Sequence, residues 1–219
     1  MVTVAVKAVI FDLDGTLLNT LTDIANAVNY TLKKNGFPTP PTEAFKRFVG
    51  NGTDIMISRA LPPDARNDKT LDALRPGYLE YYDAHSNDNT RPYDGIPKLL
   101  RDLKARGVKL AVTSNKIDCM VQLIVSQYFK NTFDYVTGQK EHVPIKPDPA
   151  MVFAAMESLG VTPTECVYVG DSGVDARTGS NSGAFTVGVS WGFRTVGELL
   201  EGGADAIISK PAELLRYVR

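Results

Sequence analysis

The sequence predicts an α/β fold: a doubly wound, mostly parallel, Rossmann-like sheet with an inserted α-helical cap. Two observations favour it. From Pro92 to the C-terminus, short apolar runs alternate with helical stripes, as expected for a parallel sheet covered on both faces. A helical block separates this part from a lone apolar run at the N-terminus. We therefore expect residues 1–17 and 92–219 to form the core and residues 18–91 the cap.

Composition narrows the class of protein. The 219 residues are 43% hydrophobic, and 24 Lys and Arg nearly balance 25 Asp and Glu. A chain this apolar can fold, and its balanced charge favours neither nucleic acid nor membrane as a partner. It contains no run of about 18 apolar residues and no signal-peptide cleavage site, which indicates a cytoplasmic protein. Cys119 and Cys166 are too few for a disulfide framework and are expected to be reduced and mostly buried.

The first half of the chain reads as one strand followed by helices. Val2–Phe11 is a near-continuous apolar run, typical of a strand buried on both faces. Apolar residues then recur at helical spacing through residues 21–32, 44–49, 54–61 and 71–82. Pro76-Gly77 is expected to break or kink the last helix. No strand is expected between about residues 18 and 91.

The second half alternates between the two element types. Strands are predicted at residues 108–112, 133–136, 166–169, 185–189 and 206–208. Helical stripes lie at 96–103, 120–128 and 152–159, and around Leu199-Leu200 and Leu214-Leu215. This order predicts successive strand–helix units.

Polar residues follow the predicted strands directly. Asp12 and Asp14 follow the first strand, Ser114 and Asn115 follow the strand at 108–112, and Asp171 follows a later strand. The carboxyl ends of parallel strands meet at one edge of the sheet, where reactive groups collect. We expect these side chains to lie close together.

The carboxylates point to a magnesium site. Asp12 and Asp14, two residues apart on an extended segment, would repel each other without a cation between them. With Asp171 they suit Mg²⁺ rather than zinc, because the sequence has no His and Cys cluster. A carboxylate can also attack phosphorus to form an aspartyl-phosphate.

Other residues supply what phosphoryl transfer requires. Ser114 and Asn115 are expected at a strand-to-helix turn, which favours phosphate, and Lys146 adds positive charge. Each motif alone also fits a structural role: a turn with Gly15 at positive φ, a helix N-cap, or a surface lysine. Four such clusters at strand ends favour a functional site.

Taken together, these motifs resemble the haloacid-dehalogenase-like hydrolases, in their phosphoglycolate-phosphatase-like subgroup with a helical cap. Asp12-Leu13-Asp14-Gly15-Thr16 matches the family's first motif and Ser114-Asn115 its second. Lys146 matches the third, and Gly170-Asp171-Ser172 with Asp175 the fourth. The resemblance covers nearly the whole chain.

The resemblance implies a role for each matched residue. Asp12 would be the nucleophile and Asp14 the general acid and then the base. Ser114, Asn115 and Lys146 would hold the transferring phosphoryl group. Mg²⁺ would bind to Asp12, to Asp14 through its backbone carbonyl and to Asp171, with Asp175 and Thr16 just outside these ligands.

The cap resemblance is narrower. Phe48-Val49-Gly50-Asn51-Gly52 resembles the loop that faces the substrate in the subgroup, so Gly50, Asn51 and Gly52 are expected to contact substrate. The same glycines also fit a helix end. Asn19-Thr20 departs from the Asp-Ser of many relatives, and no role is assigned to Asn19, Trp191, His85 or His142.

The expected function is Mg²⁺-dependent hydrolysis of a small phosphorylated metabolite, phosphoglycolate first, through a phosphoaspartate. A sugar phosphomutase or a pyrophosphatase on the same scaffold is the alternative. A phospho-acceptor signalling domain also clusters Asp and Lys at strand ends, but it needs neither a helical insertion nor a second acid. The oligomeric state is not predicted.

Overall fold

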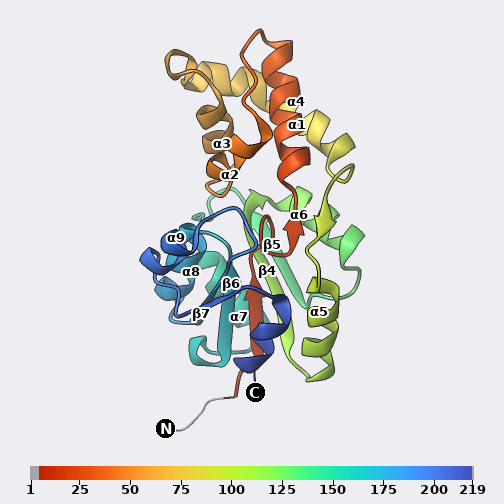
Figure 1. The fold of residues 1–219 in the computed structure, drawn as a ribbon, viewed down its shortest axis with the longest axis vertical. Helices are drawn as coiled ribbons and strands as arrows, with labels where there is room; N and C mark the ends of the chain where they lie inside the picture. The colour runs from red at the N-terminus through yellow and green to blue at the C-terminus, as the bar shows by residue number, and fades with distance from the viewer. Residues whose placement is uncertain (1–4, 219) are drawn as a thin grey trace.

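A six-stranded parallel sheet forms the centre of the protein. The computed structural model describes residues 5–218. The strands are β1 (Ala8–Phe11), β4 (Lys109–Ile117), β5 (Tyr135–Gln139), β6 (Cys166–Gly170), β7 (Phe185–Val189) and β8 (Ala206–Ile208). Their order in the sheet is β5-β4-β1-β6-β7-β8, with every pairing parallel (Figure 1). The predicted doubly wound α/β class is confirmed.

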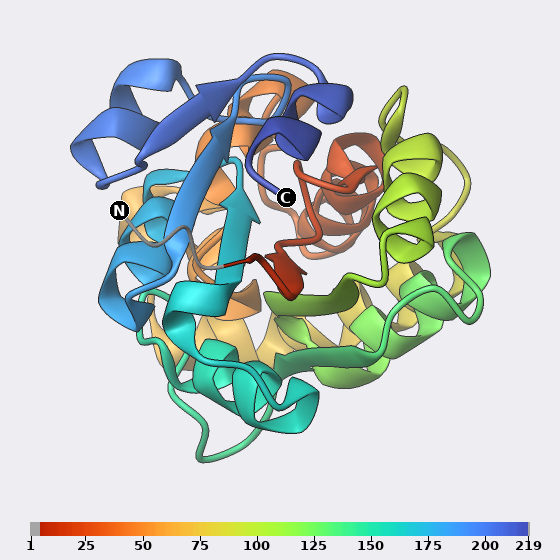
Figure 2. The same cartoon turned by 90° about the horizontal axis from the view of Figure 1, so that it is seen from below.

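Both faces of the sheet are covered, as Figure 2 shows from below. Successive β1 residues point to opposite faces, so Val9 and Phe11 pack in one apolar cluster and Ala8 and Ile10 in another. The first face is covered by α5 (Ile96–Ala105), α6 (Asp118–Tyr128) and the 3₁₀ helix η4 (Pro211–Arg216), and the second by α7 (Ala150–Leu159) and α8 (Gly173–Ser182). The 3₁₀ helix η3 (Pro163–Glu165) precedes β6, and α9 (Val196–Glu201) follows β7.

The helical block lies above the carboxyl ends of the strands (Figure 1). It contains α1 (Leu21–Lys34), α2 (Phe45–Phe48), α3 (Thr53–Ala60), α4 (Asp68–His85) and the 3₁₀ helices η1 (Thr42–Ala44) and η2 (Pro63–Ala65). The expectation of no strand here was wrong at its borders. The strands β2 (Leu18–Asn19) and β3 (Arg91–Pro92) pair antiparallel where the chain enters and leaves the block. Two residues are too few to produce a readable period.

Of the break or kink expected at Pro76-Gly77, the break was wrong, because α4 continues through Pro76. Packing against α1 supports the helix at this point. A Cβ on Gly77 would lie 2.7 Å from the Thr31 hydroxyl, so only glycine allows this approach. That hydroxyl donates to the Leu74 carbonyl at 3.2 Å. Tertiary contacts thus offset the unfavourable helix propensity of proline.

Three smaller expectations need correction. Within the described part of the strand predicted at 2–11, residues 8–11 are strand and residues 5–7 are not; residues 1–4 lie outside the described part. The strand predicted at 108–112 extends to Ile117, so no helix begins at Ser114. Cys119 is exposed, although Cys166 is buried as expected. Among residues 5–218, no helix is both long and apolar enough to cross a membrane.

A buried aspartate joins the two chain crossings between sheet and cap. Asp23 of α1 is 2% exposed and accepts hydrogen bonds from the backbone N–H groups of Asn89 and Thr90 and from both of their side chains, at 2.8 to 3.0 Å. The returning segment is therefore fixed to the start of the cap beside the β2–β3 ribbon.

We expect Asp23→Ala to lower the free energy of unfolding by about 3 kcal/mol, because it leaves several buried donors without an acceptor. Urea denaturation followed by circular dichroism measures the change. Asp83→Ala, an exposed position on α4, is the matched control and should stay within about 0.5 kcal/mol of the parent protein. Equal losses in both variants would contradict the role given to Asp23.

Candidate active site

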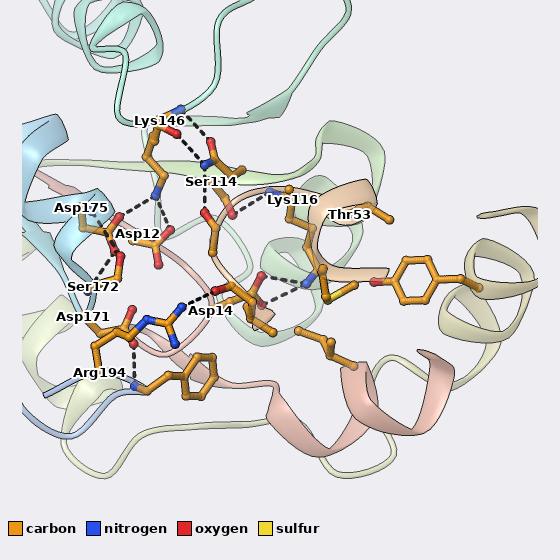
Figure 3. Close-up of a pocket in the computed structure, with 18 residues that line it drawn as sticks. Asp12, Asp14, Thr53, Ser114, Lys116, Lys146, Asp171, Ser172, Asp175 and Arg194 are labelled. Atoms are coloured by element: carbon orange, nitrogen blue, oxygen red, sulfur yellow. Dashed lines mark hydrogen bonds and ion pairs between the residues drawn. The ribbon is translucent and has the colours of Figure 1, made fainter. Parts of the chain in front are cut away.

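A cavity lies between the carboxyl ends of the strands and the cap (Figure 3). Its volume is about 50 Å³. The sheet side contributes Asp12, Asp14, Ser114, Asn115, Lys116, Lys146, Asp171, Ser172, Asp175, Phe193 and Arg194, and the cap contributes Ile24, Val49, Gly50, Gly52, Thr53, Met56 and Tyr78. The four motifs therefore converge here, as their positions predicted, together with residues 193–194 and residues of the cap.

Lys146 is the central cation of the cavity. It comes from the loop between β5 and α7 and is 2% exposed. Its Nζ donates to Asp12 Oδ1 at 2.5 Å, to Asp175 Oδ1 at 2.7 Å and to the Thr113 carbonyl at 3.2 Å. Burial would lower its pKa, but the Asp12 and Asp175 carboxylates raise that pKa well above the ordinary value. Lys146 therefore stays charged.

For the pKa of Asp12, burial outweighs the contact with Lys146. Asp12 follows β1, and its backbone N–H donates to the Val169 carbonyl of β6 at 2.8 Å. Burial raises its pKa to about 7, the Asp175 charge adds to this effect, and Lys146 opposes it. Burial, Asp175 and Asp12 likewise raise the pKa of Asp171 well above its ordinary value. Both carboxyl groups therefore ionise less readily than an exposed aspartate.

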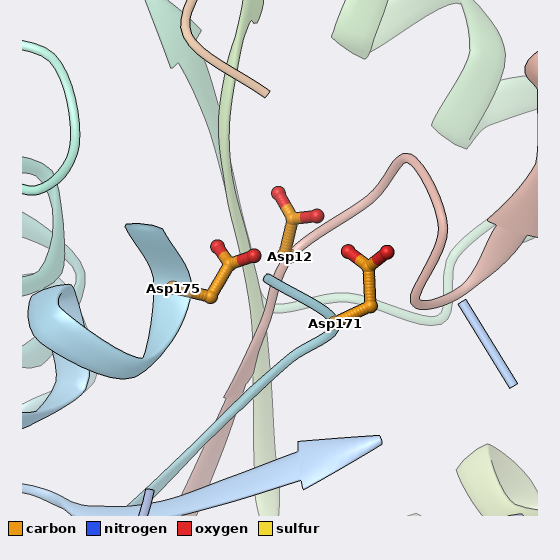
Figure 4. A group of neighbouring side chains, drawn as sticks. All are labelled: Asp12, Asp171 and Asp175. Atoms are coloured by element: carbon orange, nitrogen blue, oxygen red, sulfur yellow. The ribbon is translucent and has the colours of Figure 1, made fainter. Parts of the chain in front are cut away.

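Asp12, Asp171 and Asp175 form a candidate site for a divalent metal (Figure 4). One carboxylate oxygen from each lies within 4.8 Å of the others. Both carboxylate oxygens of Asp175 already accept hydrogen bonds and have little room for a metal. Lys146 and the Tyr168 hydroxyl donate to Oδ1, and the Ser172 N–H and hydroxyl donate to Oδ2.

Asp12 Oδ2, in contrast, accepts no hydrogen bond from the described residues. Asp171 accepts only from the Phe193 N–H, at 2.6 Å, and the Thr16 hydroxyl, at 3.4 Å. These hard oxygen donors fit Mg²⁺ or a similar cation. The geometry favours Asp12 and Asp171 as ligands and Asp175 as the group that orients Lys146.

Gly15 lets the first loop pack against this cluster. Its φ is +90°, and a Cβ there would lie 2.3 Å from Asp171 Oδ2. Thr16, directly after it, is fully buried, and its carbonyl accepts the Trp191 Nε1–H at 3.0 Å. Trp191 therefore fixes the loop that carries Asp12 and Asp14.

Asp14 turns away from the metal cluster. Its Oδ2 and Oδ1 accept from Lys116 Nζ at 2.8 and 3.0 Å, and the Lys116 side chain is 5% exposed. The same Nζ lies 4.8 Å from the centre of the Tyr82 ring of the cap. No motif in the sequence assigns a role to Lys116. Its partner Asp14 is 102 residues away, so local spacing carries no signal of the pair.

The two residues of the second motif lie on β4 rather than at a strand-to-helix turn. Ser114 lines the cavity and is 2% exposed. The Asn115 side chain is already occupied: its Nδ2 donates to the Lys146 and Gly50 carbonyls, and its Oδ1 accepts the Lys146 N–H. Asn115 thus positions the Lys146 loop and connects it to the cap, instead of leaving its amide free for phosphate.

The residues of the cap loop also differ in where they lie. Gly50 and Gly52 line the cavity, as expected. Asn51 does not; it lies in a neighbouring cleft, where its Oδ1 accepts from Arg59 Nη1 at 2.9 Å. The chain turns here, with φ of +116° at Gly50 and +90° at Gly52, and the Asn51 side chain contacts Arg59 instead of the cavity.

Comparison with known proteins identifies the family. Residues 9–189 match the family model described as haloacid dehalogenase-like hydrolase. The chain belongs to the haloacid-dehalogenase-like hydrolases. It is 32% identical over 212 residues to a phosphoglycolate phosphatase of Thiobacillus denitrificans, covering 95% of this chain and 93% of that protein. A phosphoglycolate phosphatase of Aquifex aeolicus is 30% identical over 217 residues, with coverage of 97% and 96%.

Solved structures of similar proteins share the fold of this chain. A crystal structure from Lactobacillus delbrueckii subsp. bulgaricus has a TM-score of 0.92 at 33% identity, covering 98% of both chains. A haloacid dehalogenase-like family protein of Streptococcus pneumoniae has a TM-score of 0.87 at 25% identity, covering 98% and 99%. This haloacid-dehalogenase-like hydrolase is therefore a phosphatase, similar to phosphoglycolate phosphatases.

We expect Gly15→Ala to weaken Mg²⁺ binding by about tenfold or more, because the new Cβ displaces the Asp171 carboxylate. Isothermal titration calorimetry measures the affinity. Gly107→Ala is the matched control: Gly107 also has positive φ, +74°, but a Cβ there meets nothing within 4 Å. A similar loss of affinity in both variants would mean that backbone strain, not contact with Asp171, is responsible.

We expect the stabilisation of this hydrolase by Mg²⁺ to decrease as pH falls below about 7, where the metal-free protein holds a proton on Asp12 that the cation must displace. The ordinary Asp pKa is 3.8 and the folded one about 7, so the proton favours the folded, metal-free state at low pH. That contribution is lost as pH rises through about 7. Thermal shifts with and without Mg²⁺ at several pH values test this. A shift independent of pH would contradict it.

Proposed function

We propose that this phosphatase hydrolyses a small phosphate monoester, with 2-phosphoglycolate as the first candidate, through a phosphoaspartate on Asp12 and with Mg²⁺ as cofactor. One observation carries the proposal: Asp12 shares a small cavity with a buried cation, a second acid and a hydroxyl, contributed by Lys146, Asp14 and Ser114. This set supplies a nucleophile, charge stabilisation and proton transfer.

In the first step, a carboxylate oxygen of Asp12 attacks the phosphorus. The new O–P bond forms as the bond between phosphorus and the leaving oxygen breaks, and that oxygen takes a proton from Asp14. The alcohol product leaves with this proton. Lys116 holds both Asp14 oxygens and so orients the acid.

In the second step, Asp14, now ionised, takes a proton from a water molecule, whose oxygen attacks the phosphorus. The bond between phosphorus and Asp12 breaks, and inorganic phosphate and the free Asp12 carboxylate result. Asp14 thereby regains the proton that it gave to the leaving group, which balances the cycle.

Fixed charges support both steps. Lys146 is held by two carboxylates and cannot swing away, so it acts as a preorganised cation beside the transferring group. The Ser114 hydroxyl is available to donate to a phosphoryl oxygen. When bound at Asp12, Asp171 and the Asp14 backbone carbonyl, Mg²⁺ would screen the negative charges of nucleophile and substrate.

The choice of substrate rests on size and on the relatives. Gly50, Gly52 and Met56 of the cap leave about 50 Å³ of free space, which favours a compact leaving group. Relatives at 30 to 35% identity that cover most of the chain are phosphoglycolate phosphatases. This similarity favours phosphoglycolate over sugar phosphates or pyrophosphate.

A panel of phosphate esters tests the proposal. With Mg²⁺, we expect the purified protein to prefer 2-phosphoglycolate over glucose 1-phosphate, pyrophosphate and nucleotides in kcat/KM, and to lose activity in excess chelator. Asp12→Asn should be folded but inactive, because an amide does not form the acyl-phosphate. A wild-type rate in Asp12→Asn would exclude the covalent step, and a preference for pyrophosphate or for mutase products would favour the alternatives.

We expect Lys116→Met to lower kcat about 10- to 100-fold on alkyl phosphates and only a few-fold on an aryl phosphate, because a good leaving group needs little protonation by Asp14. Steady-state kinetics on both esters measures the difference. Lys98→Met is the control, since the Lys98 side chain is 72% exposed. Equal losses on the two esters would show that Lys116 does not act through Asp14.

A further inference from the structure

Arg194 lies where the cavity meets the outside. It follows β7, its side chain is 15% exposed, and it lies beside Asp171 (Figure 3). It lines the cavity and also a second, larger cleft of about 640 Å³ between the cap and the α8–α9 side of the core. Arg47, Arg59 and Arg177 line that cleft as well, and with Arg194 they outnumber its carboxylates, Glu198 and Glu201. An anionic substrate would be attracted along this route.

The charge of Arg194 is poorly compensated, unlike that of the other cations lining the cavity. Lys116 and Lys146 each contact carboxylate oxygens at 3.0 Å or less. The carboxylate contact of Arg194 within residues 5–218 is to Glu198, at 3.8 Å, and the Glu198 side chain is 50% exposed. Such a long and hydrated contact neutralises little charge.

Arg59 adds a second positive charge nearby. Burial and the charge of Arg194 lower the pKa of Arg59 below its ordinary value. Arg59 Nη1 donates to the Arg47 and Phe48 carbonyls and to Asn51 Oδ1. An anion near Arg194 would therefore also relieve a repulsion.

The hydrogen bonds of the Arg194 guanidinium are incomplete. Its Nη2 donates to the Val49 carbonyl at 2.9 Å and to the Arg47 carbonyl at 3.2 Å, both in the cap. Its Nη1 is buried and has no acceptor among the described residues. Buried donors are rarely left without a partner, so this nitrogen points to an acceptor supplied by a ligand.

We propose that Arg194 is a specificity-determining residue that binds a carboxylate on the leaving group. This inference rests on the proposed function and extends it, because it assigns the part of the substrate beyond the phosphoryl group. A planar guanidinium matches a carboxylate in geometry and charge. Since its Nη2 already binds cap carbonyls, Arg194 would hold the anionic end of the substrate at the boundary of core and cap.

Two esters of nearly equal size test the proposal: 2-phosphoglycolate, which has the carboxylate, and 2-hydroxyethyl phosphate, which has a hydroxyl in its place. We expect Arg194→Gln to lower the ratio of their kcat/KM values about 10- to 100-fold, mainly through KM for phosphoglycolate. Arg194→Lys keeps the charge and should lower the ratio less. Arg101→Gln is the matched control, because Arg101 is exposed on α5 and lines neither the cavity nor the second cleft, and it should leave the ratio unchanged.

Each outcome decides between the claims. Equal losses on both esters in folded Arg194→Gln and Arg194→Lys would overturn the carboxylate assignment while leaving the proposed function intact. A wild-type protein without preference between the two esters would do the same. If the wild type hydrolyses no small phosphate monoester, the proposed function itself fails and this inference fails with it.

Discussion

The buried ammonium of Lys146 is the interaction on which the rest of the site depends. Four carboxylates line one small cavity, and without a cation inside it their mutual repulsion would oppose folding. Lys146 offsets this by contacting Asp12 and Asp175 together, and so joins the end of β1 and the middle of β4 to the first turn of α8. Asn115 holds the Lys146 backbone on both sides. The arrangement leaves Asp12 Oδ2 and Asp171 with room for a second, exchangeable cation.

The cap is connected to the site through several side chains of the core. Asn115 donates to the Gly50 carbonyl, Arg194 to the Val49 carbonyl, and Lys116 faces the Tyr82 ring. Each of these core residues also meets a group at the centre of the site. Asn115 contacts the Lys146 backbone, Arg194 lies beside Asp171, and Lys116 contacts Asp14. The position of the cap is therefore coupled to the geometry of the acidic groups, so that loop residues far from the phosphorus influence the residues next to it.

The sequence predicted the sheet, the cap and the convergence of motifs well, because each rests on local periodicity or on polar residues at strand ends. It failed where distant contacts decide. The helix through Pro76 depends on Thr31, and β4 continues past Ser114 beside β5. The Lys116–Asp14 pair joins residues 102 positions apart. The lack of an acceptor for Arg194 Nη1 among the described residues arises from burial. Composition and local spacing do not predict such tertiary contacts, whereas Asp12, Asp14, Lys146 and Asp171 stand in recognisable motifs.

The β2–β3 ribbon and the Asp23 contacts have a consequence for substrate entry. Both chain crossings between core and cap run side by side and are tied together at one point. When a domain rotates about a hinge, its displacement is smallest at the hinge and largest at the far edge. In Figure 1 the ribbon lies on the right of the molecule, and α8 and α9, which border the arginine-lined cleft, lie on the left. If the cap rotates about these crossings, its largest displacement falls at the arginine-lined cleft, so an incoming anion would meet arginines before it meets the aspartates.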